Sequence, residues 1–120
     1  MMTFHKNQRL AKALMREIDI TVQQYGRQTI REVVQDLVVR NILKSAHTSD
    51  DQVLRTIYQT GVLRMNTAPK MAELHSLLGR YTRGLLGLCT NCGRRIPAPM
   101  LERSPSRTLC ERCEASEGTR

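Results

Sequence analysis

All four cysteines of the chain fall in one stretch near its C-terminus, and their spacing constrains the fold more than any other feature. They form two C-x-x-C pairs, Cys89 with Cys92 and Cys110 with Cys113, separated by 17 residues. Each pair makes a tight turn that directs two sulfur atoms at one point, so the two pairs supply the four ligands of a tetrahedral Zn²⁺ site. Because such a shell has no open position for a substrate, the spacing predicts one structural zinc ion and not a zinc enzyme.

Two disulfides or a redox-active dithiol are the alternatives for these cysteines. Disulfides need an oxidising compartment, and the first six residues, MMTFHK, lack the apolar run of a secretory signal. A redox C-x-x-C normally lies in a βαβ context and has no matching second pair. No stretch approaches the roughly 20 apolar residues of a membrane-spanning helix. We therefore expect a cytoplasmic protein with reduced thiols and no membrane association.

The composition predicts an aliphatic core and an anionic partner. Hydrophobic residues make up 40% of the 120 residues and aromatic residues only 3%, with no Trp. Stacking platforms for single-stranded nucleic acid are therefore not expected. The formal charge of +8 indicates a polyanion or an acidic protein surface as partner. Near the cysteines this charge is partly cancelled, because four thiolates with one Zn²⁺ ion leave a net negative charge.

Residues 1–86 have the pattern of a series of helices. Apolar residues recur at three- and four-residue steps through residues 10–22. Capping boxes predict helix starts at Thr29, with Glu at the third following position, and at Ser49, with Gln at that position. Pro69 marks one more start, because proline is tolerated in a first helical turn. The sequence therefore predicts a mostly α-helical region.

Two arrangements of these helices fit the sequence, the second almost as well as the first. If the chain folds back at a turn near 45–51, Gly26 lies opposite Pro69, which gives an antiparallel hairpin or coiled coil with both arms broken at one level. A small helical bundle with the same boundaries is the alternative. In either case a four-cysteine zinc finger over 87–115 (the finger) follows, with a short C-terminal helix, and residues 116–120 are expected to be a disordered tail.

Glycine, isoleucine and proline residues surround the cysteine pairs in a specific order. Gly84 and Gly87 precede the first pair, Gly93 and Ile96 follow it, and Pro105 precedes the second. This pattern, with the same gap of 17 residues, resembles the zinc finger of the DksA/TraR family of transcription regulators, of which the chain would be a divergent member. The resemblance covers about a third of the chain.

The resemblance implies a bacterial, phage or plasmid regulator that binds RNA polymerase directly and modulates transcription initiation. In that family a coiled coil enters the secondary channel of the polymerase, its acidic tip approaches the active-site region, and the nucleotide ppGpp often acts with it. The tip position falls on Asp50 and Asp51, some 38 residues before Cys89. These acids are adjacent here, where the family has D-x-x-D-x-A. Arg80 and Arg83, just before the finger, are further candidates for contacts with polymerase or a nucleotide phosphate.

Simpler roles remain open for these residues, as do two other functions. Asp50 and Asp51 suit the positive end of a helix dipole, and Arg80 and Arg83 suit a solvated face. The main alternative function is a small basic DNA-binding repressor with a helix-turn-helix-like bundle over 29–65 and a structural zinc ion. The third is a zinc-stapled protein-interaction module. No Ser/His/Asp set, phosphate loop or H-E-x-x-H motif is present, so we expect no enzymatic activity.

Overall fold

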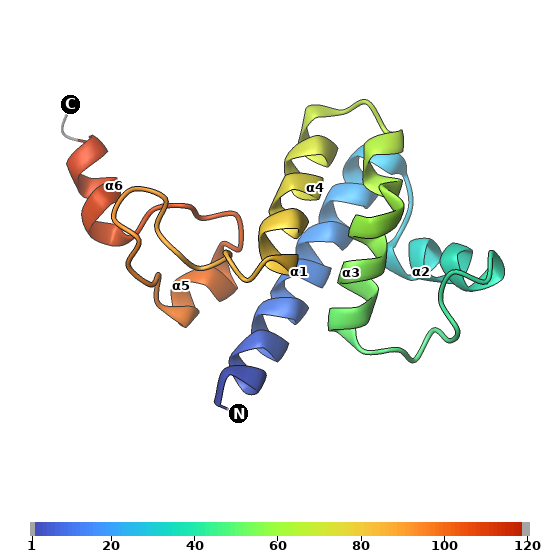
Figure 1. The fold of residues 1–120 in the computed structure, drawn as a ribbon. Helices are drawn as coiled ribbons and strands as arrows, with labels where there is room; N and C mark the ends of the chain where they lie inside the picture. The colour runs from blue at the N-terminus through green and yellow to red at the C-terminus, as the bar shows by residue number, and fades with distance from the viewer. Residues whose placement is uncertain (1, 119–120) are drawn as a thin grey trace.

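The computed structural model describes residues 2–118, with side chains described for residues 8–116. Within this range the chain is mostly helical and has no strand, which confirms the predicted fold class (Figure 1). None of the described helices combines the length and apolarity needed to cross a membrane. The elements in chain order are α1 (Met2–Gly26), α2 (Ile30–Val39), α3 (Asp50–Thr60), the 3-10 helix η1 (Val62–Met65), α4 (Pro69–Thr82), α5 (Ala98–Arg103) and α6 (Glu111–Gly118).

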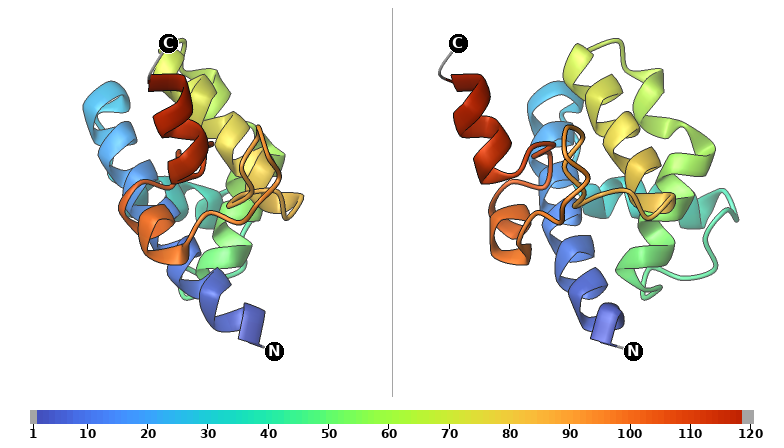
Figure 2. Two further views of the ribbon diagram at one scale, coloured as in Figure 1. Left: turned by 90° about the vertical axis from the view of Figure 1, so that its left-hand side faces the viewer. Right: turned by 60° about the vertical axis from the view of Figure 1, so that its left-hand side comes forward.

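The first five elements form a small bundle, so the extended hairpin is the wrong alternative. Helix α1 packs against α2, α3 and α4, and α3 packs against α4. The views in Figures 1 and 2 agree that α2 runs across the other helices. The chain reverses after Gly26, where Arg27 has a positive φ of 54°, and α2 therefore cannot prolong α1.

Helix α2 begins at the predicted capping box, and α1 contributes a further contact there. The hydroxyl of Thr29 accepts the N–H of Glu32 at 3.2 Å, and the Glu32 carboxylate accepts the N–H of Thr29 at 3.2 Å. Asp19 of α1 accepts the N–H of Ile30 at 2.9 Å, and this bond lowers the pKa of the Asp19 carboxyl. Because the first N–H groups of a helix have no partner within the helix, Asp19 both caps α2 and fixes it to α1.

The other two predicted helix starts are also confirmed. Ser49 accepts the N–H of Gln52 at 3.3 Å and caps α3, although no reciprocal bond from the Gln52 side chain is seen. Pro69 lies in the first turn of α4. Helix α3 ends at Gly61, which has a left-handed φ of 66° that glycine adopts without strain.

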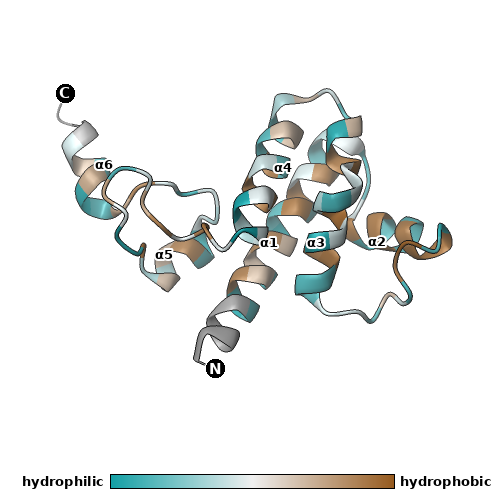
Figure 3. Ribbon diagram, in the orientation of Figure 1, coloured by the Kyte–Doolittle hydropathy of each residue, from teal (hydrophilic) through white to brown (hydrophobic). Residues whose placement is uncertain are grey.

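An aliphatic core fills the space between α1, α3 and α4, as the composition predicted. In Figure 3 the hydrophobic residues of these helices lie along their facing sides. Close approach of α3 and α4 depends on Gly79, because a Cβ there would lie 3.0 Å from Tyr58 Cε1. Fully buried core side chains are Leu14 and Ile18 of α1, Leu54 and Ile57 of α3, and Leu78 of α4.

The finger packs against the bundle through α1. Helix α5 contacts α1, and Leu10 of α1 packs against both the bundle core and a separate small core in the finger. That second core contains Ile96 and Leu101 together with three of the cysteines. Helix α5 is not among the helices predicted from the sequence, although Pro99 in its first turn is a helix-start signal.

The prediction of a disordered tail over 116–120 is wrong for its first part. Helix α6 continues to Gly118, and residues 119–120 lie outside the described range. Glu111 and Glu114 occupy the first turn of α6, where negative charge is favourable against the helix dipole. Acidic residues in the first turn stabilise the helical turns that follow. The pattern of apolar residues alone does not reveal this effect.

Candidate metal centre

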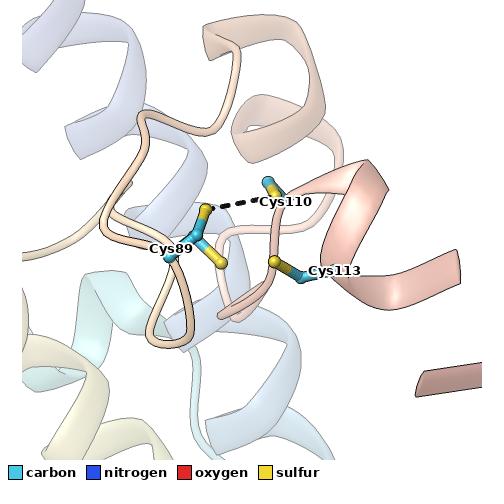
Figure 4. A group of neighbouring side chains, drawn as sticks. Cys89, Cys110 and Cys113 are labelled. Carbon is cyan, nitrogen blue, oxygen red and sulfur yellow. Dashed lines mark hydrogen bonds between the residues drawn. The ribbon is translucent and has the colours of Figure 1, made fainter. Parts of the chain in front are cut away.

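The four cysteines lie together at the predicted site. All four Sγ atoms lie within 4.8 Å of one another, and Sγ of Cys92 lies 3.7 Å from Sγ of Cys110. Four sulfurs at about 2.3 Å from a central ion would be about 3.8 Å apart, so the cluster has the size of a tetrahedral metal site. Figure 4 shows the sulfurs of Cys89, Cys110 and Cys113 directed toward one another. The thiols can therefore hold one metal ion.

The first cysteine pair is shaped by a closed backbone turn. Cys89 donates its N–H to the carbonyl of Arg94 at 2.8 Å, and Gly93 donates its N–H to the carbonyl of Cys89 at 3.0 Å. Gly93 has a φ of 75°, which favours glycine. Gly87, just before the pair, has a φ of 95°, and a Cβ there would lie 2.9 Å from Leu101 Cδ1. Gly84 likewise has a φ of 72°, so all three glycines that carry the family resemblance adopt left-handed backbone conformations.

The second pair lies at the start of α6 and is tied to the first. Glu114 donates its N–H to the carbonyl of Cys110 at 2.9 Å, so Cys110 and Cys113 share one face of the first helical turn. The N–H and the hydroxyl of Thr90 both donate to the carbonyl of Thr108, at 2.8 and 3.2 Å. These bonds hold the two turns at a fixed separation, which is what brings the four sulfurs together.

The electrostatics of the cluster lower the pKa of one thiol and raise the pKa of another. Backbone N–H groups of Cys110 and Cys92 lower the pKa of Cys89 to about 6. Asn91 donates its side-chain amide to Cys113 Sγ at 3.3 Å and lowers the pKa of that thiol, but the neighbouring cysteines and burial together raise it to about 12. Four thiolates at this distance repel one another unless a metal ion lies between them.

Asp50 and Asp51 lie in the first turn of α3, and Asp51 is part of the contact between α3 and α4. One carboxylate oxygen of Asp51 accepts the hydroxyl of Tyr81 at 2.6 Å, and the other accepts Arg55 Nε at 3.0 Å. Asp51 also lines one pocket with Leu10, a residue that contacts the finger core. The acids therefore lie at the finger end of the bundle and not at a remote tip.

We expect the Asp51–Tyr81 bond to stabilise the bundle in a pH-dependent manner. Partial burial acts to raise the pKa of Asp51, but Tyr81 and Arg55 outweigh it and lower that pKa, while burial and the Asp51 bond raise the pKa of Tyr81 well above its ordinary value. The carboxylate contribution is thus present above about pH 4 and lost as pH falls further. The phenol contribution is present below about pH 10 and lost as pH rises further.

Urea unfolding of a Tyr81→Phe variant with the metal bound tests this expectation. At pH 7 the variant should lose about 1 kcal/mol, since bonds to charged groups are worth more than neutral ones but the Asp51 side chain is half exposed. In a double-mutant cycle with Asp51→Asn, the two losses should be less than additive. Above pH 10 the difference between the wild type and Tyr81→Phe should shrink. A difference that stays constant up to pH 11 would show that the hydroxyl is not bonded to a carboxylate.

The two arginines named from the sequence have different environments. Arg80 donates from Nη2 to the carbonyls of Leu85 and Leu88, both at 3.3 Å, and so connects the last turn of α4 to the segment that enters the finger. Arg83 is exposed and lines one pocket with Asp51. Arg80 therefore has a positioning role that its sequence context did not reveal. Arg83 lies in solvent, as the simpler interpretation of the sequence expected.

No family model, curated protein or solved structure matches the chain. The resemblance of the finger therefore rests on its own residues, and what it implies stays a proposal. The structure itself shows a helical bundle with a docked finger whose four clustered cysteines could hold a metal ion.

Proposed function

We propose that the protein is a small DNA-binding transcription regulator with one structural Zn²⁺ ion. Cys89, Cys92, Cys110 and Cys113 would hold the ion, because four cysteine ligands in a closed tetrahedron are the donor set of structural zinc sites. The ion would supply no chemistry with a substrate. Its role would be to fix the finger against α1, and the remaining surface would carry the function.

The distribution of charge is the observation that supports DNA as the partner. Residues 1–86 contain 13 Lys and Arg against 7 Asp and Glu, and residues 87–115 contain 5 Arg against 3 Glu. Because the zinc-bound thiolates add net negative charge, the loaded finger is close to neutral. The excess positive charge then lies on the bundle, and a compact basic domain is the electrostatic footprint expected of a protein that contacts phosphates.

The proposal is tested with purified, zinc-loaded protein and naked duplex DNA. We expect binding to promoter DNA at physiological salt, with an affinity that falls steeply as salt rises. Gel filtration with core RNA polymerase in the absence of DNA is the parallel measurement. Protein that ignores the duplex but co-elutes with the polymerase would overturn DNA binding.

Direct binding to RNA polymerase is the second candidate, and the backbone of the finger favours it. Gly87, Gly93 and Ile96 carry the resemblance to the DksA/TraR finger; the two glycines have positive φ angles, and Ile96 is buried in the finger core. Insertion of Asp50 and Asp51 into the secondary channel is not part of this candidate, because no helical hairpin projects from the bundle in the described part of the chain. Polymerase contact through the finger, with or without ppGpp, would remain, and the co-elution measurement decides it.

A further inference from the structure

A row of cations follows the exposed side of α1. Arg9, Lys12 and Arg16 recur at three- and four-residue steps, which places them on one face of the helix, and all three are exposed. Leu14 and Ile18, on the opposite face, are fully buried in the bundle core. The three cations, which we call the α1 cation row, reach solvent although Ala13 beside them is buried.

Helix stability does not explain the α1 cation row. Residues 2–16 contain four Lys and Arg and no Asp or Glu, although the N-terminal part of a helix favours acidic residues. None of the ion pairs in the described part of the chain includes Arg9, Lys12 or Arg16. Asp50 and Asp51 line one pocket with Lys12, but neither arginine lines it. The charge of the row is therefore largely available to a partner.

The position and length of the row fit a DNA strand. The N-terminal end of α1 extends beyond the other helices of the bundle in every view (Figures 1 and 2). Arg9 and Arg16 are separated by about 10 Å along the helix axis, and over that length a DNA strand presents about three phosphates. The finger core contacts α1 at Leu10, which lies within the length of the row but about 100° around the helix axis from Arg9. The three cations stay exposed beside it.

We infer that the α1 cation row is the surface that contacts the phosphate backbone of duplex DNA. This inference rests on the proposed DNA binding and assigns it to one helix. The finger is the competing surface, but two of its arginines are already engaged: Arg107 pairs with Glu114, and Arg103 donates to the carbonyl of Pro99 at 3.3 Å. Because phosphate contacts carry no sequence information, the row sets affinity and orientation and does not select a sequence.

The test is the triple variant Arg9→Gln, Lys12→Gln and Arg16→Gln, measured with a fluorescent duplex of about 25 base pairs between 50 and 200 mM salt. Glutamine keeps a helix propensity close to that of arginine and lysine, so circular dichroism and metal content should not change. Loss of three phosphate contacts should lower the slope of log K against log salt by about 2.7. The wild type should therefore lose about 40-fold more affinity than the variant over this range.

A matched control removes three cations from other elements, with Arg31→Gln, Lys44→Gln and Arg64→Gln. These side chains are exposed and lie on α2, the turn after it and η1. The slope of log K against log salt should therefore change by less than the loss of about one phosphate contact would cause. If the slope of log K against log salt falls by the same amount in both triple variants, only net charge matters and the row is not the binding surface. If the wild type binds no duplex at any salt, the proposed DNA binding itself fails, and the two failures are thus distinguished.

Discussion

Chelation of the metal ion should unfold the finger and leave the bundle folded. The four sulfurs are within 4.8 Å of one another, and the finger core consists largely of the ligands themselves with Ile96 and Leu101. Without the ion, the thiolates repel one another and the remaining core is too small to keep residues 87–115 folded. The binding energy of a structural zinc ion is folding energy. The bundle has its own core of 17 buried residues and does not depend on the metal.

Two-dimensional NMR of labelled protein before and after EDTA measures this effect residue by residue. Amide signals of the finger should collapse into the narrow range of unfolded chains, while those of α3 and η1 keep their dispersion. A Cys110→Ser variant should bind no zinc after dialysis, whereas Ser106→Ala, an exposed finger residue, should keep one ion per chain. Unaltered finger signals in EDTA would contradict a structural metal ion, and unfolding of the whole chain in one step would contradict two cores.

Replacement of Leu14 by alanine should be the most destabilising single change in the bundle. Leu14 is 0% exposed and lies in the core cluster that α1, α3 and α4 share. Leu→Ala substitutions at such sites cost about 2–5 kcal/mol, because the transfer free energy of the side chain is lost and a cavity remains. The free energy of unfolding from urea denaturation, with zinc present, measures the loss.

Leu85→Ala is the matched control, since the chemical change is the same. Leu85 follows α4 and is 43% exposed, so its replacement should cost less than about 0.5 kcal/mol. Equal losses at the two positions would mean that α1 is not the central helix of a bundle. In an extended hairpin the same leucine would contact only the helix of the opposite arm and leave a smaller cavity.

The metal site could be predicted almost completely from the sequence. Four cysteines in two short turns can reach one point for local reasons, since each C-x-x-C pair fixes its own sulfurs. Gly87 and Gly93 are glycines because their φ angles are positive, and this requirement is also local. The same holds for the capping residues Thr29 and Ser49, whose side chains bond to N–H groups three positions away.

Contacts between distant residues could not be predicted in this way. The pair of acids at Asp50 and Asp51 fits a helix start and an acidic tip equally well, and only the approach of Tyr81, 30 residues later, assigns Asp51 to the bundle. The role of Arg80 likewise depends on where the chain goes after α4. The periodicity of α1 marks its buried side but does not say which helices cover it, and Leu10 faces two cores at once.

Sequence by itself determined the helical class, the helix starts and the four-cysteine cluster, because propensity, capping and ligand spacing act over a few residues. Tertiary structure decided between hairpin and bundle, because the two share every local signal and differ only in which apolar faces meet. It also showed that Asp50 and Asp51 lie at the finger end of the bundle and not at a remote tip. Asp51 is bonded within the bundle, whereas the cations of α1 are exposed because the other elements of the fold leave them uncovered.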